Sequence, residues 1–314
     1  MAKLKKIVHY VNLHGGSALL ISNKIASVVL VLLACHWIGY TQEQKPKSNS
    51  TDQYQALIDS SFLYGDARKY AEAERSLKRA IELNPRHPLN ALLLNNLGGI
   101  QELQQKYNEA LLSYSAALEL NSDDATTRAN RAKLFVTLGN LKAALTDYSI
   151  LVSQEASNEV YRYQRAMTYI LNKEYDLAEA DLMTIVDNNS ESLKPRIGLA
   201  LLKTMQREYD EAERLYDNLL IRLPKSAEVY EGRARLYLAR GMKGYALRDV
   251  NKAFELSGPS ISAPLYRLRA EILTAMSERK SAAQDFETAN KLEPQNPRDR
   301  QNKTDSKQKS RPAK

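Results

Sequence analysis

Side chains able to carry out covalent or acid–base chemistry are scarce in the main body of this 314-residue chain. The single cysteine is Cys35, and three of the four histidines precede residue 37, which leaves His87 as the one imidazole of the body. The sequence has no H-E-x-x-H, paired-cysteine, G-x-x-x-x-G-K or G-x-G-x-x-G motif. We therefore expect no metal site, no cofactor and no catalytic residue, and predict that the protein is not an enzyme. The alternative is an enzyme that uses carboxylates alone.

One pair of opposite charges recurs at a fixed spacing. Its four occurrences are Arg131/Asp147, Arg165/Asp181, Arg233/Asp249 and Arg269/Asp285. Where the arginine is missing at an equivalent position, the aspartate is missing too, as at Leu199 and Leu215. Residues that come and go together within one chain are expected to touch, and a guanidinium matches a carboxylate with two parallel hydrogen bonds. We predict four structural ion pairs, in preference to a charged binding site.

These pairs belong to a repeat with a period of 34 residues. The seven units start at residues 54, 91, 125, 159, 193, 227 and 263, with two short insertions. Position 8 of each unit is small, and position 20 is always alanine, from Ala73 to Ala282. Spacings of 3, 4 and 7 between apolar positions are typical of helices. Gly139 and Gly241 at position 15, and a proline at position 32 of three units, indicate two helices per unit joined by a short turn.

This pattern resembles the tetratricopeptide repeat (TPR) family over residues 54–296, although the tryptophan that the family carries at position 4 is absent. The resemblance implies an all-α fold, a right-handed superhelical solenoid of seven helix-turn-helix units. Ten of the chain's 18 tyrosines then occupy positions 11, 17 and 24, where an apolar ring with a hydrated hydroxyl group suits the half-buried seams between helices. A base-stacking role would need these rings on one exposed basic face.

The resemblance also implies a binding groove, lined by positions 2, 5, 9 and 12 of each first helix. In repeats 4 and 5 these positions are apolar, and we predict that a peptide or helix from a partner protein docks on Val160, Tyr163, Met167, Ile170, Ile197 and Leu201. The alternative is that these side chains pack against neighbouring first helices. The Lys/Asn/Arg clamp of co-chaperones is matched only at its asparagine, so that role is not expected.

The net charge of +8 resides at the two ends of the chain. Residues 1–50 and 295–314 each carry +5, and residues 51–294 carry −2, so we expect no nucleic-acid partner. Residues 1–41 resemble an export signal or membrane anchor, with lysines before an apolar run at 25–34. Three alternatives stay open: lipidation of Cys35 within a Leu-Leu-Ala-Cys lipobox, ordinary cleavage before Gln42, and an uncleaved anchor in the membrane.

The expected organisation is therefore an anchor or signal at 1–41, a polar linker at 42–53, a solenoid at 54–296 and a disordered basic tail at 297–314. From it we predict an exported scaffold or adaptor, periplasmic or membrane-anchored in a bacterial cell envelope, that binds a partner segment in its concave groove. The alternative is a structural spacer or assembly component that binds through its convex face or its ends.

Overall fold

The protein is described from a computed structural model, which places residues 49–292. This part of the chain contains fourteen helices and no strand, and the helices follow one another in seven antiparallel pairs. The pairs are α3 (Asn49–Asp66) with α4 (Tyr70–Leu83), α5 (Asn90–Leu103) with α6 (Tyr107–Leu120), α7 (Ala125–Thr137) with α8 (Leu141–Gln154), α9 (Glu159–Leu171) with α10 (Tyr175–Asn188), α11 (Lys194–Gln206) with α12 (Tyr209–Arg222), α13 (Ala227–Ala239) with α14 (Lys243–Ser257), and α15 (Ala263–Ala275) with α16 (Arg279–Leu292).

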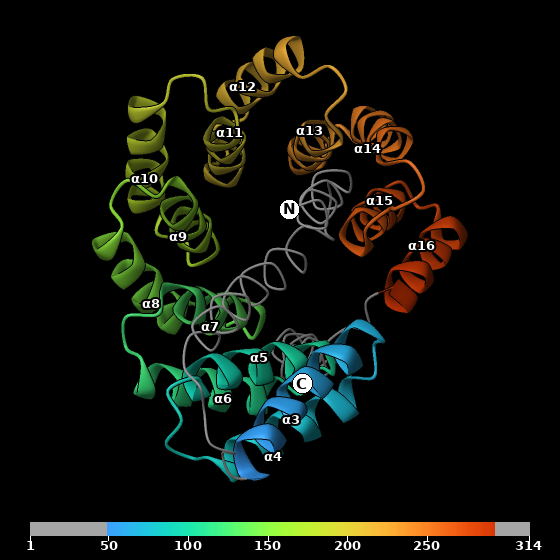
Figure 1. The fold of residues 1–314 in the computed structure, drawn as a ribbon. Helices are drawn as coiled ribbons and strands as arrows, with labels where there is room; N and C mark the ends of the chain where they lie inside the picture. The colour runs from blue at the N-terminus through green and yellow to red at the C-terminus, as the bar shows by residue number, and fades with distance from the viewer. Residues whose placement is uncertain (1–48, 293–314) are drawn as a thin grey trace, which may run out of the picture.

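The pairs stack into a curved solenoid with two layers of helices. Odd-numbered helices form the inner layer and even-numbered helices the outer layer (Figure 1). Each outer helix from α4 to α14 packs against the inner helix before it and the one after it, and α16 packs against α15. Along the inner wall, α11 also contacts both α9 and α13. The predicted all-α solenoid of seven helix-turn-helix units is thus confirmed.

Two rows of small residues let the two helices of each pair cross closely. The alanine at position 20 is at most 3% exposed in every repeat: Ala73, Ala110, Ala144, Ala178, Ala212, Ala246 and Ala282. At position 8 of the second repeat, the ring of Tyr114 lies 2.6 Å from the point where a β-carbon on Gly98 would stand. A larger side chain at these crossings would push the helices apart, at a cost of about 1–3 kcal/mol.

The turn inside each pair contains a residue with a left-handed backbone. Glycine signalled this turn in the sequence at Gly139 and Gly241 alone. In the other five repeats a non-glycine residue holds the same position with φ between 58° and 69°: Arg68, Gln105, Lys173, Arg207 and Ser277. A side chain in this conformation costs about 1–2 kcal/mol. The packing of the two helices therefore imposes the turn, whatever residue occupies it.

The first helix begins earlier than the sequence suggested. Residues 42–53 were expected to be a polar linker, but α3 starts at Asn49 and so includes the last five of them. Asp52 lies in its first turn, where a negative charge is favoured by the helix dipole. Tyr54 is 4% exposed and donates a hydrogen bond to Asn90 at 3.2 Å, which ties α3 to α5.

The expected signal at 1–41, Cys35 and the tail at 297–314 lie outside the described residues. Within residues 49–292, no helix is both long enough and apolar enough to cross a membrane.

Candidate binding surfaces

All four predicted ion pairs are present, each joining the two helices of one repeat. The arginine Nε and Nη2 atoms donate to the two carboxylate oxygens, at 2.9 and 2.8 Å for Arg131/Asp147 and at 2.8 and 2.7 Å for Arg165/Asp181. The third and fourth pairs repeat this geometry: Arg233/Asp249 at 2.6 and 3.2 Å, and Arg269/Asp285 at 2.7 Å twice. The aspartates are buried, at 2–5% exposed. These residues hold the repeat together and are not an open charged site.

Three of these four arginines also reach the preceding repeat, a connection that the sequence analysis missed. Arg131 donates its Nη1 to Ser115 at 3.2 Å, Arg165 to Ser149 at 3.4 Å, and Arg233 to Asp217 at 2.6 Å. Each acceptor lies 16 residues before its arginine, just as each aspartate lies 16 residues after it. That symmetric spacing is the signal which would have revealed the contact.

A second arginine joins two of the buried aspartates. Arg128 approaches Asp147 at 3.5 Å and Arg162 approaches Asp181 at 3.2 Å, both from the position where the family carries tryptophan. The hydrogen bonds with Asp181 raise the pKa of Arg165 above its ordinary value, so this guanidinium stays charged inside the fold. The ring of Tyr169 lies 5.8 Å from the same guanidinium and adds a cation–π contact.

The six residues of the predicted groove do not form one open surface. Ile170 and Ile197 are 3% and 9% exposed and belong to the core between neighbouring helices. These two side chains pack against neighbouring helices, which is the alternative that the sequence left open. Tyr163, Met167 and Leu201 are half-buried, and Val160 is 63% exposed.

Tyr163 packs against two residues of the helix α11. Its ring lies 3.3 Å from the position of a β-carbon on Gly198, so the glycine of α11 makes room for it. The ammonium group of Lys194, on the same helix, lies 5.0 Å from the ring centroid. Burial, with a smaller contribution from the charge of Glu228, raises the pKa of Tyr163 to about 12. The phenol is therefore neutral near pH 7 and acts as a hydrogen-bonding apolar ring.

Most tyrosines occupy the seams that the sequence predicted for them. Tyr114, Tyr148 and Tyr216 at position 24 are at most 3% exposed, and burial raises the pKa of each. The tyrosines at position 17 are half-buried, while Tyr64 at position 11 is 37% exposed. Core packing accounts for the rings at position 24.

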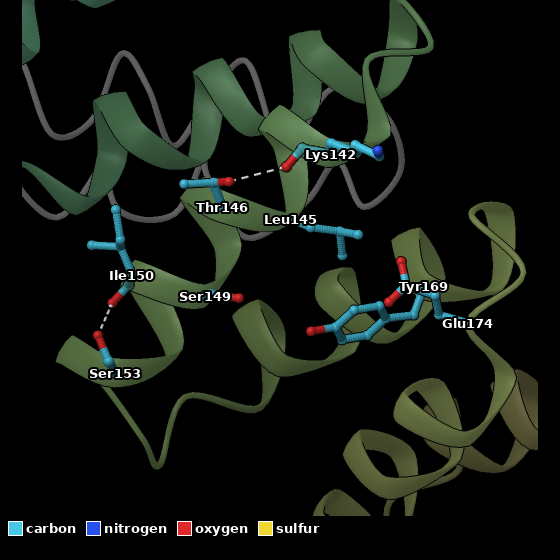
Figure 2. A pocket seen from close by; sticks show the side chains of 8 residues that line it. All are labelled: Lys142, Leu145, Thr146, Ser149, Ile150, Ser153, Tyr169 and Glu174. Atoms are coloured by element: carbon cyan, nitrogen blue, oxygen red, sulfur yellow. Dashed lines mark hydrogen bonds between the residues drawn. The ribbon is translucent and has the colours of Figure 1, made fainter.

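An open cleft lies beside the outer helix α8. It has a volume of about 570 Å³ and is lined by Lys142, Leu145, Thr146, Ser149, Ile150 and Ser153 of α8, together with Tyr169 and Glu174. In Figure 2, Tyr169 points its hydroxyl toward α8 across the cleft. A single carboxylate, Glu174, lines this space. No group of three metal-ligating side chains occurs within residues 49–292.

Comparison with known proteins decides the family. A family profile described as "Tetratricopeptide repeat" matches residues 63–125 and 198–254. A tetratricopeptide repeat protein of known crystal structure, from Parabacteroides merdae ATCC 43184, is 38% identical to this chain; the match covers 77% of this chain and 94% of that one, with a TM-score of 0.70. The chain belongs to the tetratricopeptide repeat family. Such repeats generally serve as protein-binding modules without catalytic activity, which is the broad role that the fold supports.

Two more distant structures share the fold of this TPR protein. Yeast Tom70 is 16% identical with a TM-score of 0.57, over 90% of this chain and 65% of its own. The APC/C hetero-tetramer Cut9–Hcn1 contributes a match of 13% identity and TM-score 0.51, over 79% of this chain and 53% of that one. No curated protein sequence matches the chain significantly.

Proposed function

We propose that this TPR protein is a non-enzymatic scaffold that binds a segment of another protein on the inner face of repeats 4 and 5. The observation that carries the proposal is the exposure of Val160 on α9 beside the half-buried Tyr163, Met167 and Leu201. An apolar side chain that is 63% exposed contributes little to the stacking of helices. A partner that covers it gains the hydrophobic free energy of its burial. Ile170 and Ile197 lie beneath as part of the core that supports this surface.

The character of the inner face changes in the next repeat. Glu228, Glu231 and Arg235 occupy the equivalent positions of α13, where Arg235 donates to Glu231 at 2.6 Å. On the other side, Asn130 of α7 donates to Asn95 of α5 at 2.9 Å. The apolar patch is therefore bordered by amides on one side and charges on the other. Such a border favours a partner segment with one or two apolar anchors flanked by polar residues.

The test places a photo-crosslinking amino acid at position 160 in the full-length protein. The matched control carries it at position 221, where Ile221 is 79% exposed on the outer helix α12. We expect a defined polypeptide to crosslink at 160 and not at 221, and Val160→Glu to weaken the affinity of that purified partner at least about tenfold. Equal crosslinking at both positions, or unchanged affinity of Val160→Glu, would contradict the proposal.

We further propose that residues 1–41 export the protein and that Cys35 tethers it to a bacterial envelope membrane. The lysines, the apolar run at 25–34 and the Leu-Leu-Ala-Cys sequence support this proposal. We expect a labelled fatty-acid precursor to be incorporated into the wild-type protein and not into Cys35→Ala. Labelling of Cys35→Ala at the wild-type level would exclude lipidation at this cysteine. Release of the unlabelled wild-type protein into the soluble periplasmic fraction would instead indicate ordinary cleavage.

A further inference from the structure

The outer helices of repeats 2 to 4 differ from the other outer helices in their charge. Helices α6 and α10 contain no lysine or arginine, and α8 contains Lys142 alone. Each of α4, α12, α14 and α16 contains two or three basic residues. Since all seven outer helices face solvent in the same way, solvation gives no reason for this difference.

Apolar side chains replace the missing charges. Leu112 and Leu120 on α6 are 72% and 59% exposed, and Leu177 and Met183 on α10 are 48% and 42% exposed. Single exposed apolar residues are ordinary on protein surfaces. Here they lie on α6 and α10, the outer helices before and after α8, and such a group is the usual mark of an interaction surface.

The cleft described above lies in the middle of this surface. Helices α8 and α10 both pack against α9, and the cleft opens between α8 and the start of α10. Leu145, Ile150 and the ring of Tyr169 supply its apolar lining (Figure 2). The hydroxyls of Thr146 and Ser153 donate to carbonyl oxygens of their own helix, which satisfies them locally. A side chain entering the cleft therefore meets apolar groups and hydrogen-bonded hydroxyls, with Lys142 and Glu174 as the charged residues of the lining.

The border of this surface is acidic. Glu119, Asp176 and Asp187 are exposed and have no ion-pair partner among the described residues, and Glu174 stands at the mouth of the cleft. Lys142 is the one basic side chain of the three helices. Asp147 and Asp181 belong to the same helices but are buried against arginines of the inner layer. The exposed side chains at the border of this surface therefore carry a net negative charge.

We propose that the outer face of α6, α8 and α10 binds an amphipathic helix that carries leucine-type side chains on one face and lysine or arginine beside them. Its apolar side chains enter the cleft between α8 and α10 and cover Leu112 and Leu177. Its basic side chains meet the acidic border, which selects against acidic partners and against anionic membranes. Helix-in-groove binding of this kind is a general recognition mode. This surface is separate from the inner face of repeats 4 and 5 and does not depend on it.

The experiment measures binding of a fluorescent synthetic helix to the full-length protein by anisotropy. The probe has about 18 residues, roughly 27 Å of helix, with leucines on one face and lysines on the other. We expect Ile150→Lys and Leu112→Lys each to weaken binding at least about tenfold, and Asp176→Lys about threefold. The control matched to Leu112→Lys is Ile221→Lys on α12, because Ile221 is 79% exposed and Leu112 is 72% exposed. This control lies outside the surface and leaves the affinity within about twofold.

Four results would overturn the proposal. One is equal affinity for a probe in which glutamate replaces every lysine, and another is wild-type affinity of Ile150→Lys. A third is equally tight binding of a peptide with the sequence of residues 295–314, which would assign the surface to the chain's own basic tail. The fourth is a wild-type dimer that Leu112→Lys dissociates, which would assign it to a second copy of the protein.

Discussion

At the scale of single residues, the arginine at position 7 is the main polar link of the solenoid. Arg165 contacts Asp181 in its own repeat, Ser149 in the preceding repeat and the ring of Tyr169. Because the aspartate is buried and the arginine largely so, neither charge is well hydrated if the other is removed. Breaking such a pair from one side is far more costly than replacing both partners by apolar residues.

We therefore expect Asp181→Asn to lower the free energy of unfolding by about 3–5 kcal/mol, because it leaves both Arg165 and Arg162 without their carboxylate. The matched control is Asp217→Asn, which removes a 53% exposed carboxylate from Arg233 and should cost at most about 1 kcal/mol. Urea unfolding followed by circular dichroism at 222 nm measures both. Equal losses in the two variants would mean that burial does not set the strength of these pairs.

At the scale of helices, a buried carboxylate joins the first two repeats. Glu74 of α4 is 4% exposed and pairs with Lys78 and Lys106, each at 2.7 Å, while Gln104 donates to it at 2.8 Å. Burial alone would raise the pKa of Glu74, but the hydrogen bonds from Lys106, Lys78 and the glutamines outweigh it and lower the pKa from 4.5 to about 2. The carboxylate stays ionised and fastens α4 to the turn between α5 and α6.

The sign of the pH dependence follows from this shift. A carboxyl group with a depressed pKa in the folded state stabilises the fold above its unfolded pKa of 4.5 and loses that effect as the pH falls toward 2. The shift of about 2.5 pKa units corresponds to about 3–4 kcal/mol at pH 7, at about 1.4 kcal/mol per pKa unit. We expect Glu74→Gln to be less stable than wild type by that amount at pH 7, and the difference to narrow by about half between pH 5 and pH 3.

Chemical denaturation of both proteins at a series of pH values measures this difference. Glu82→Gln serves as the control, because Glu82 lies on the same helix and pairs with Arg79 while 64% exposed. It should change stability by less than about 1 kcal/mol at every pH. A difference between Glu74→Gln and wild type that does not depend on pH would show that Glu74 is not ionised in the fold.

At the scale of the whole molecule, each repeat contacts little beyond its neighbours, so stability is close to a sum over repeats and their interfaces. Two kinds of surface result. In the inner layer, direct contacts join α9, α11, α13 and α15, and small patches such as Val160 stay open. The outer layer leaves spaces between successive even-numbered helices, and these spaces include the cleft beside α8. One chain can thus present two separate binding surfaces.

The contacts between the two helices of one repeat could be predicted from the amino-acid sequence alone. The alanines at position 20, the small residues at position 8 and the Arg/Asp pairs are contacts between helices adjacent in the chain, so a 34-residue period exposes them directly. The contacts and burial that depend on the rotation between successive repeats could be seen only in the tertiary structure. That rotation buries Ile170 and Ile197 while leaving Val160 open, and it brings Arg165 to Ser149. It also opens the cleft between α8 and α10. Many small contacts set this rotation together, and no single residue type signals it.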